Sequence, residues 1–267
     1  MKEIILFDMD GTLTPARQKM DINMEMRLHE AQRKGFDIGI ITGSDMNYVR
    51  HQCSRLFDLS LVDSSRIHFL PCNGTKYLLN DKMVYERNMR EYMGETLWNR
   101  LMILLIELQK DLVLEHDIPL TGHFFDYRGS TLNWCPIGRN AEEKDRSKWE
   151  RMDSDYKIRK PFLKQLKTLV HTQCSNLGDL SSSDVELSVK YGGDTSFDIF
   201  PLGWDKTYPL ENTDIFHDYS KIYFVGDRCE QDGNDYEIYE HSKITGFKTT
   251  SPDETIKIMN KILYSNV

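Results

Sequence analysis

Two aspartates lie two residues apart near the start of the chain, in the segment FDMDGT. Asp8 follows an apolar run, and Asp10 precedes Gly11, which allows a tight turn. Two carboxylates at this spacing repel each other and shift each other's pKa unless a cation or an acid/base role separates them. The apolar run EIILF before them is typical of a strand buried on both faces. The segment therefore indicates cation binding or proton transfer at the end of a buried strand.

A third carboxylate, Asp227, follows another apolar segment, KIYFVG. Ligands of an open α/β sheet bind outside the carboxyl ends of its strands, so we expect Asp227 to lie near Asp8 and Asp10. Mg²⁺ is a hard cation that proteins usually hold with one or two carboxylates together with substrate phosphates. We therefore expect Mg²⁺ at this edge. If FDMDGT were only a turn with a helix cap, nothing would account for carboxylates at two separate strand ends.

A hydroxyl and an ammonium group complete this set. Ser44, in ITGSD, follows the second apolar strand segment, where its hydroxyl and backbone N–H groups can hold a phosphoryl oxygen. Lys206 can neutralise negative charge on Asp8 and on a group that is being transferred. A lone serine or lysine means little, but together with the aspartates they indicate phosphoryl transfer.

The composition excludes several other classes of protein. A formal net charge of −8 gives no general attraction for nucleic acid or anionic membranes. The longest apolar run, residues 101–106, is too short to span a bilayer. Met1 leads directly into a strand segment without the features of a secretory signal, so we expect a cytoplasmic protein with reduced thiols. The five cysteines form no CxxC pair: Cys53, Cys72, Cys135, Cys174 and Cys229.

Strand and helix signals alternate from the first residue onward. Residues 3–8 and 36–42 have the pattern of buried strands. Between them we expect a helix that is capped by Asp21 and ends at Gly35, and a further helix begins near Asp45. This alternation predicts an α/β fold with a doubly wound, mostly parallel sheet.

The pattern changes near residue 75, where antiparallel hairpins and a helix over 90–112 are expected instead. We therefore predict a core made of residues 1–82 and 203–267, interrupted by an inserted α+β domain of residues 83–202. The expected hairpins are TKYLLNDKMVYE, FFDYRGSTLNW and VELSVKYGGDTSFDIF.

Basic and polar residues of the insert suit a sugar phosphate. Arginine binds phosphate through two parallel hydrogen bonds, although any single arginine taken alone is more often a solvated surface charge. Two polar residues flank Phe197 and so share one face of a strand, where they can bind sugar hydroxyls. The residues of this expected site are Arg128, Arg139, Arg146, Ser196 and Asp198.

The segments FDMDGT, ITGSD, the lysine and VGDRCEQDGND, in this order, resemble the four motifs of the haloacid dehalogenase (HAD) superfamily of phosphotransferases. The resemblance implies a Rossmann-like core. It also implies that Asp8 is the nucleophile that forms an aspartyl-phosphate and that Asp10 is the general acid/base. By the same resemblance, Asp8, the backbone carbonyl of Asp10 and Asp227 bind Mg²⁺.

A more specific resemblance covers most of the chain. The segments TLTPARQKM, YRGSTLNWCPIGR, GGDTSFDIFPLGWDK and GDRCEQDGNDYEIY are similar to those of the eukaryotic-type phosphomannomutase family, which carries an α/β cap in the insert. This implies interconversion of mannose 6-phosphate and mannose 1-phosphate through a hexose 1,6-bisphosphate, feeding GDP-mannose synthesis, in a homodimer joined through the cap. The residues that would hold the hexose phosphate are Arg17, Arg128, Arg139, Arg146, Ser196 and Asp198.

The sequence departs from this family's pattern at four positions. Thr42 stands where a glycine is expected, and Cys72 where a glutamate is expected. A loop that binds a second, structural cation in the family has His241 and Ile244 here in place of an aspartate and a threonine. Two alternatives stay open: a HAD-type sugar phosphatase that hydrolyses hexose phosphates, and a non-catalytic protein that binds sugar phosphates. The choice between mannose and glucose is also open.

Overall fold

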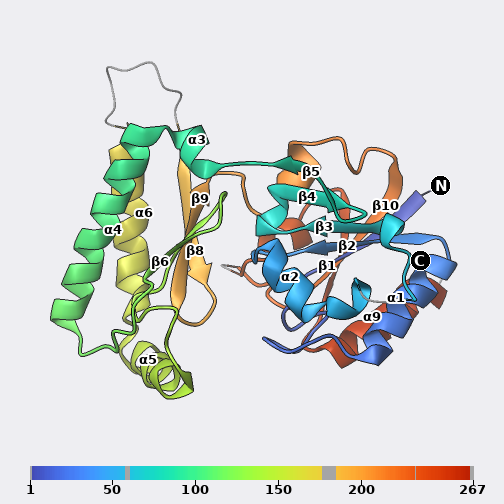
Figure 1. The fold of residues 1–267 in the computed structure, drawn as a ribbon, viewed down its shortest axis with the longest axis horizontal. Coiled ribbons are helices and arrows are strands. Elements are labelled where there is room, and N and C mark those ends of the chain that lie inside the picture. Colours follow the sequence, from blue (N-terminus) through green and yellow to red (C-terminus); the bar gives the residue numbers. More distant parts are fainter. Residues whose placement is uncertain (1, 58–60, 176–184, 232, 265–267) are drawn as a thin grey trace. The chain divides into compact units, whose positions relative to one another are not determined.

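The computed structural model describes residues 2–57, 61–175, 185–231 and 233–264, with the side chains of residues 171–175 left aside (Figure 1). The chain divides into two compact units. Met1–Glu86 with Trp204–Val267 form the first, called here the core unit, and Arg87–Gly203 form the second, called the insert unit. Residues 83–86, which the sequence-based boundary assigned to the insert, form part of the core sheet, because they pair with the strand before them.

The core unit contains a seven-stranded sheet in the order β11-β10-β1-β2-β3-β4-β5. The pairs from β11 to β3 are parallel, and β4 and β5 add an antiparallel edge, so the sheet is mostly parallel as predicted. The strands are β1 (Lys2–Phe7), β2 (Phe36–Ile41), β3 (Ile67–Leu70), β4 (Lys76–Leu79), β5 (Lys82–Glu86), β10 (Tyr219–Gly226) and β11 (Ile244–Lys248).

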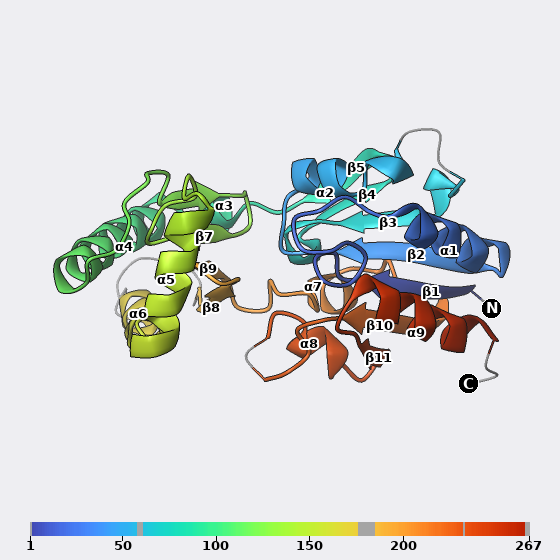
Figure 2. The same ribbon diagram turned by 90° about the horizontal axis from the view of Figure 1, so that it is seen from below.

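Helices cover both faces of this sheet, because its central strands are apolar on both sides. Ile5 and Phe7 of β1 belong to a cluster with residues of α1 (Ile22–Arg33), α2 (Met46–Gln52) and α9 (Pro252–Tyr264). Ile4 and Leu6, which point the other way, pack with residues of α7 (Tyr208–Glu211) and α8 (Tyr236–Tyr239). Figure 2 shows α1 and α9 side by side. The sheet is therefore doubly wound.

Local signals set the ends of these elements. The Asp21 carboxylate accepts a hydrogen bond from Asn23 N and caps α1, which is followed by Gly35 with φ 99°. Asn80 and Asp81, with φ 50° and 59°, make the predicted turn between β4 and β5. Short 3-10 segments occur at η1 (Ser54–Leu56), η2 (Ser64–Arg66) and η3 (Cys72–Gly74).

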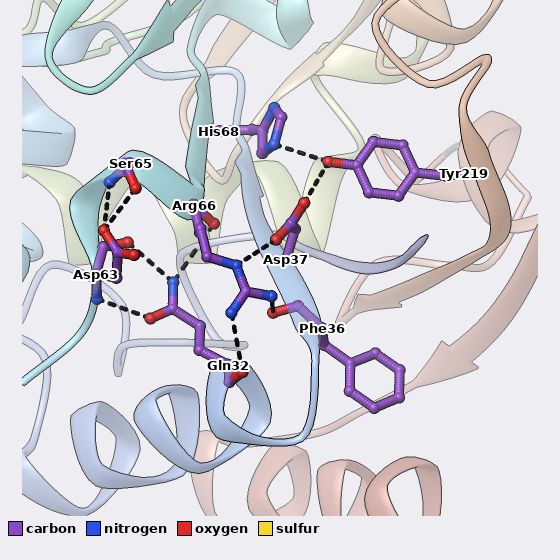
Figure 3. Close-up of polar contacts among 8 residues, drawn as sticks. All are labelled: Gln32, Phe36, Asp37, Asp63, Ser65, Arg66, His68 and Tyr219. Carbon is purple, nitrogen blue, oxygen red and sulfur yellow. Dashed lines mark hydrogen bonds and ion pairs between the residues drawn. The ribbon is translucent and has the colours of Figure 1, made fainter. Parts of the chain in front are cut away.

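A hydrogen-bonded network joins the amino ends of three strands of the core sheet (Figure 3). Arg66 donates from Nε to Asp37 on β2 at 2.7 Å, and the Tyr219 hydroxyl on β10 donates to the other Asp37 oxygen at 2.7 Å. The same hydroxyl lies 3.0 Å from Nε2 of His68 on β3. Gln32 of α1 joins the network through two hydrogen bonds with the backbone of Asp63.

The insert unit has a four-stranded antiparallel sheet in the order β6-β7-β9-β8. The two hairpins predicted for this part of the chain form, whereas the helix expected over 90–112 is divided in two at Gly94, which has φ 75°. Helix α6 packs on β8, and α4 packs beside α6 (Figure 1). The elements are α3 (Met89–Met93), α4 (Glu95–Glu115), β6 (Phe125–Tyr127), β7 (Leu132–Trp134), α5 (Glu143–Tyr156), α6 (Arg159–Ser175), β8 (Leu187–Gly192) and β9 (Ser196–Pro201).

Two further predictions concern the thiols and the membrane. Cys53, Cys72, Cys135 and Cys229 are buried free thiols, and Cys174 lies outside the side chains that are described. Within the described part of the chain, every helix is too short or too polar for a membrane crossing.

Candidate active site

The carboxyl ends of β1 and β10 bring Asp8 and Asp227 together, as the sequence predicts. One oxygen from each of these aspartates and one from Asp235 all lie within 4.8 Å of one another. The turn between Asp8 and α1 needs a glycine at this point: Gly11 has φ 79°, and a Cβ there would lie 2.5 Å from Oδ2 of Asp227. The conformation of the FDMDGT turn therefore makes room for the carboxylate that comes from the other strand.

Lys206 joins this group from the point where the chain returns to the core unit. Its side chain is 1% exposed, and its Nζ donates to Asp8 and, at 2.5 Å, to Oδ1 of Asp235. Asp235 is fully buried, and its Oδ2 accepts a hydrogen bond from Arg228 N at 3.1 Å. Both Asp235 oxygens are thus used to hold Lys206 and the backbone after β10.

Asp235 was missed by the sequence-based reasoning. It lies in GDRCEQDGND, a segment with several acidic residues, and only the path of the loop after β10 decides which of them returns to the sheet edge. The Asp235 side chain packs against the backbone of Gly226 at the end of β10. A Cβ on Gly226 would lie 2.6 Å from Oδ2 of Asp235, so this position needs a glycine.

Negative charge exceeds positive charge among these four side chains. Burial raises the pKa of Asp8; Lys206 opposes this rise, and the carboxylates of Asp235 and Asp227 add to it. Burial and Asp235 also raise the pKa of Asp227. For Lys206, burial disfavours the ammonium, but Asp235 and Asp8 outweigh it and raise its pKa. Three carboxylates facing one ammonium fit a divalent cation, which Asp8 and Asp227 are placed to hold because both oxygens of Asp235 have other partners.

The Asp10 side chain is directed away from this group of carboxylates. Its Oδ1 accepts hydrogen bonds from the backbone N–H of Arg17 at 3.0 Å and from the Tyr48 hydroxyl at 3.1 Å. Arg17 has φ 61° and an exposed side chain in the core unit. Asp10 and Asp8 therefore have different surroundings although they lie two residues apart, which is what two different chemical roles require.

Ser44 lies at the carboxyl end of β2 in a loop held by its own hydrogen bonds. Its backbone N–H donates to Oγ1 of Thr42 at 3.2 Å, and its carbonyl accepts from Cys72 N at 2.8 Å. The carbonyl of Thr42 accepts from Asn73 N at 2.7 Å. Thr42 is one of the residues that depart from the family pattern, and its hydroxyl accepts the hydrogen bond of the Ser44 N–H. This N–H was expected to hold a phosphoryl oxygen. The Ser44 hydroxyl is the group that is left for that role.

In the insert unit, two of the predicted arginines share one carboxylate. Nε of Arg128 and Nε of Arg139 lie 3.0 Å and 3.3 Å from Oδ2 of Asp126. Arg139 also donates to Oδ1 of Asn133 at 3.0 Å, and Asn133 donates to Oδ1 of Asp198 at 2.6 Å. Burial and the neighbouring Arg128 lower the pKa of Arg139, although Asp126 opposes this. Guanidinium groups can bind an anion through two parallel hydrogen bonds, and Arg128 and Arg139 lie together here beside Asp126, with Asp198 joined to Arg139 through Asn133.

The third predicted arginine lies with Ser196. Arg146 donates to Oγ1 of Thr195 at 3.4 Å, and this hydroxyl lies 3.4 Å from the hydroxyl of Ser196. Ser196 and Asp198 are two residues apart on β9, so their side chains share a face as predicted. The partners Asp126, Asn133 and Thr195 were not predicted, because they act by holding the predicted residues in place.

The loop that binds a second cation in the family has basic side chains at the nearby oxygens in this chain. Nε2 of His241 lies 2.6 Å from Oε1 of Glu211, and Nζ of Lys243 lies 3.7 Å from the same oxygen. Lys243 also donates to the Leu210 carbonyl at 3.1 Å. These residues do not fit a second cation, because an ammonium and an imidazole lie at the available oxygens.

Comparison with known proteins identifies the family. The family model described as eukaryotic phosphomannomutase matches residues 24–265. The chain belongs to the eukaryotic phosphomannomutase family. It is 31% identical to the phosphomannomutase of Drosophila melanogaster, over 97% of this chain and 95% of that protein. It is 33% identical to that of Schizosaccharomyces pombe, over 98% of this chain and 94% of the relative.

Solved structures with a similar fold include a nucleotidase and a phosphatase-related protein. An IMP-bound Plasmodium falciparum IMP-nucleotidase mutant aligns with a TM-score of 0.64 and 12% identity, over 98% of this chain and 68% of that one. A trehalose-6-phosphate phosphatase related protein aligns with a TM-score of 0.52 and 14% identity, over 97% and 96% of the two chains. At this identity they support the fold, while the family assignment comes from the phosphomannomutases.

Proposed function

We propose that this protein is a phosphomannomutase that interconverts mannose 6-phosphate and mannose 1-phosphate through an aspartyl-phosphate and a bound hexose 1,6-bisphosphate. The observation that carries this proposal is the pairing of Asp8 with the fully buried Lys206 in a group with excess negative charge. The arginines of the insert unit are proposed to supply a second place for a phosphate, as the resemblance to the family implies.

Asp8 is the nucleophile in the proposed reaction. Its carboxylate oxygen forms a bond to phosphorus while the bond from phosphorus to the sugar oxygen breaks. Lys206 keeps positive charge beside Asp8 and the phosphoryl oxygens, and Asp235 fixes the position of Lys206. The Ser44 hydroxyl binds a phosphoryl oxygen. Mg²⁺, held by Asp8, Asp227 and the backbone carbonyl of Asp10, supplies neutralisation of phosphoryl charge when it is bound.

Asp10 moves the proton. As general acid it gives a proton to the sugar oxygen that leaves phosphorus, and as general base it takes a proton from the sugar hydroxyl that is phosphorylated in return. The residues proposed to hold the other phosphate and the sugar hydroxyls during both steps are Arg17, Arg128, Arg139, Arg146, Ser196 and Asp198. The insert acts as a cap that keeps water from the aspartyl-phosphate, so that transfer to sugar exceeds hydrolysis.

The proposed setting follows from this activity. Mannose 1-phosphate is an activated sugar that a nucleotidyl transfer would consume, and we place the protein in the cytoplasm in the supply of GDP-mannose. The proposed homodimer forms through the cap, where Ile103, Ile106 and Leu114 of α4 are apolar side chains more than half exposed.

A sugar phosphatase is the second candidate, and Thr42 is the observation that favours it. Its hydroxyl accepts a hydrogen bond from the Ser44 N–H in the loop at the carboxyl end of β2. One assay distinguishes the two activities: the protein is incubated with Mg²⁺, mannose 1-phosphate and a trace of glucose 1,6-bisphosphate, and mannose 6-phosphate and free phosphate are both measured. A mutase forms mannose 6-phosphate only with the bisphosphate present. Fast phosphate release that is independent of the bisphosphate would refute the proposal.

A further inference from the structure

One tyrosine outside the predicted site contacts the proposed general acid/base. The Tyr48 hydroxyl lies 3.1 Å from Oδ1 of Asp10, and the Arg17 backbone N–H donates to the same oxygen at 3.0 Å. Over the described residues, no hydrogen bond reaches the other oxygen, Oδ2. The two Asp10 oxygens are therefore not equivalent: one is held by two donors, and the other is left for a reacting group.

Helix α2 fixes the position of the Tyr48 ring. Asp45 caps the helix by accepting a hydrogen bond from Tyr48 N at 3.0 Å, so Tyr48 lies in the first turn. Gln52, one turn further on and 2% exposed, contacts the Tyr48 hydroxyl. Its Oε1 has no hydrogen-bond partner in the part of the chain that is described.

Tyr48 is the donor in its bond to Asp10, because an ionised carboxylate can only accept a hydrogen bond. Its proton is directed to Oδ1 of Asp10, the same oxygen that accepts the backbone N–H of Arg17.

We propose that Tyr48 is a positioning residue for the reaction: by holding Oδ1 of Asp10 it makes Oδ2 the atom that exchanges a proton with the sugar oxygen. This inference rests on the proposed function, in which Asp10 is the general acid/base. Tyr48 touches neither the sugar nor the phosphate in this role. It acts through the orientation of the Asp10 carboxyl group.

The leaving group provides a specific test. When a sugar phosphate phosphorylates Asp8, the bond between phosphorus and the sugar oxygen breaks, and the strongly basic alkoxide takes the proton of Asp10. When acetyl phosphate is the donor, the same bond to Asp8 forms, but acetate leaves without needing a proton. A residue that positions Asp10 matters for the first reaction and not for the second, whereas a residue that only supports the fold affects both alike.

The experiment compares wild type with Tyr48→Phe, which loses only the hydroxyl. In the full chain with Mg²⁺, mutase turnover is measured, and phosphorylation of Asp8 by acetyl phosphate is followed by rapid quench and intact mass. We expect kcat for mannose 1-phosphate to fall about tenfold or more, with KM nearly unchanged. Acetyl phosphate should phosphorylate the variant at the wild-type rate.

Tyr77→Phe is the matched control, because it also removes the hydroxyl of a tyrosine that hydrogen-bonds a titratable side chain. The Tyr77 hydroxyl lies 3.0 Å from Nδ1 of His68, away from Asp10. This variant should unfold at a lower temperature and keep both reaction rates.

Two outcomes would overturn the role of Tyr48: equal losses with both donors, or an unchanged kcat. The proposed function fails in a different way, by hydrolysis of mannose 1-phosphate without formation of mannose 6-phosphate in the wild type. Even then the Tyr48 proposal is tested, because hydrolysis of a sugar phosphate needs the same proton, and Tyr48→Phe must slow it.

Discussion

The carboxyl and amino edges of the core sheet both bury ionisable side chains, but they differ in how these charges are balanced. At the carboxyl edge, Asp8, Asp227 and Asp235 face the single ammonium of Lys206. At the amino edge, one carboxylate, Asp37, pairs with one guanidinium (Figure 3). A balanced network adds hydrogen bonds to the fold at little electrostatic cost, whereas an excess of like charge persists where a ligand completes it.

The geometry at the amino edge shows which group donates each hydrogen bond around His68. The Tyr219 hydroxyl has one proton, which it donates to Asp37, so it accepts the proton of His68 Nε2. The other ring nitrogen of His68 accepts from the Tyr77 hydroxyl. His68 is therefore neutral with both nitrogens satisfied, and burial lowers its pKa to about 4. The side chains of this network therefore all have hydrogen-bond partners from the protein itself: Asp37, Arg66, His68 and Tyr219.

The largest expected effect separates the two edges by function. Asp8→Asn removes the proposed nucleophile, and we expect turnover to fall on the order of 10⁴-fold or more while the fold is retained. Asp37→Asn is the matched change at the amino edge, where it breaks the pair with Arg66 and should cost about 2 kcal/mol of unfolding free energy without changing kcat. Mutase assays and urea unfolding of both variants check this. Activity in Asp8→Asn would mean that the nucleophile is a different residue.

The second prediction concerns the pH dependence of stability at the amino edge. The pKa of His68 is about 4 in the folded protein and is near 6.5 when unfolded, so the unfolded chain binds a proton first as the pH falls. The resulting stability is fully present above pH 6.5 and is lost as the pH falls through 4, by about 3 kcal/mol. Urea unfolding of wild type and His68→Gln between pH 7 and 4 measures the difference. Parallel pH profiles for the two proteins would contradict it.

The third prediction tests the excess of carboxylates. Mg²⁺ is proposed to bind the folded carboxyl edge and not the unfolded chain, so it should raise the unfolding free energy by about 2.7 kcal/mol at about 100 times its Kd. Thermal unfolding with Mg²⁺ or with EDTA measures this gain. In Asp227→Asn the gain should shrink strongly, and in Asp37→Asn it should persist. An equal response of both variants would place the cation elsewhere.

Sequence patterns predict the features that depend on one element at a time. Buried strands follow from apolar runs, and the helix starts at Asp21 and Asp45 follow from their caps. The approach of Asp8 to Asp227 is also predictable, because both residues follow strands of one parallel sheet. The helix expected over 90–112 is interrupted because Gly94 adopts a conformation outside the helical region.

Contacts that depend on the path of a loop cannot be predicted from sequence patterns. Asp235 reaches Lys206 because the loop after β10 turns back, and Tyr48 reaches Asp10 across 38 residues of sequence. In the insert unit, Asn133 meets Asp198 because β7 and β9 pair in that register, which residue types alone do not determine. These residues hold the groups that react or bind, and their side chains look ordinary in the sequence.

The smallest expected effect comes from two tyrosines that make the same bond at opposite edges. Tyr48 donates to Asp10 at 3.1 Å, and Tyr219 donates to Asp37 at 2.7 Å. Tyr219→Phe should cost about 1.5 kcal/mol of unfolding free energy, because it removes the half-buried hydrogen bonds of this hydroxyl with Asp37 and His68, and should leave kcat unchanged. Urea unfolding and mutase assays of this variant beside Tyr48→Phe check the contrast. If Tyr219→Phe lowered kcat as much as Tyr48→Phe, the amino edge would have to be coupled to the reaction, and the balance of charge would no longer distinguish a structural network from a functional one.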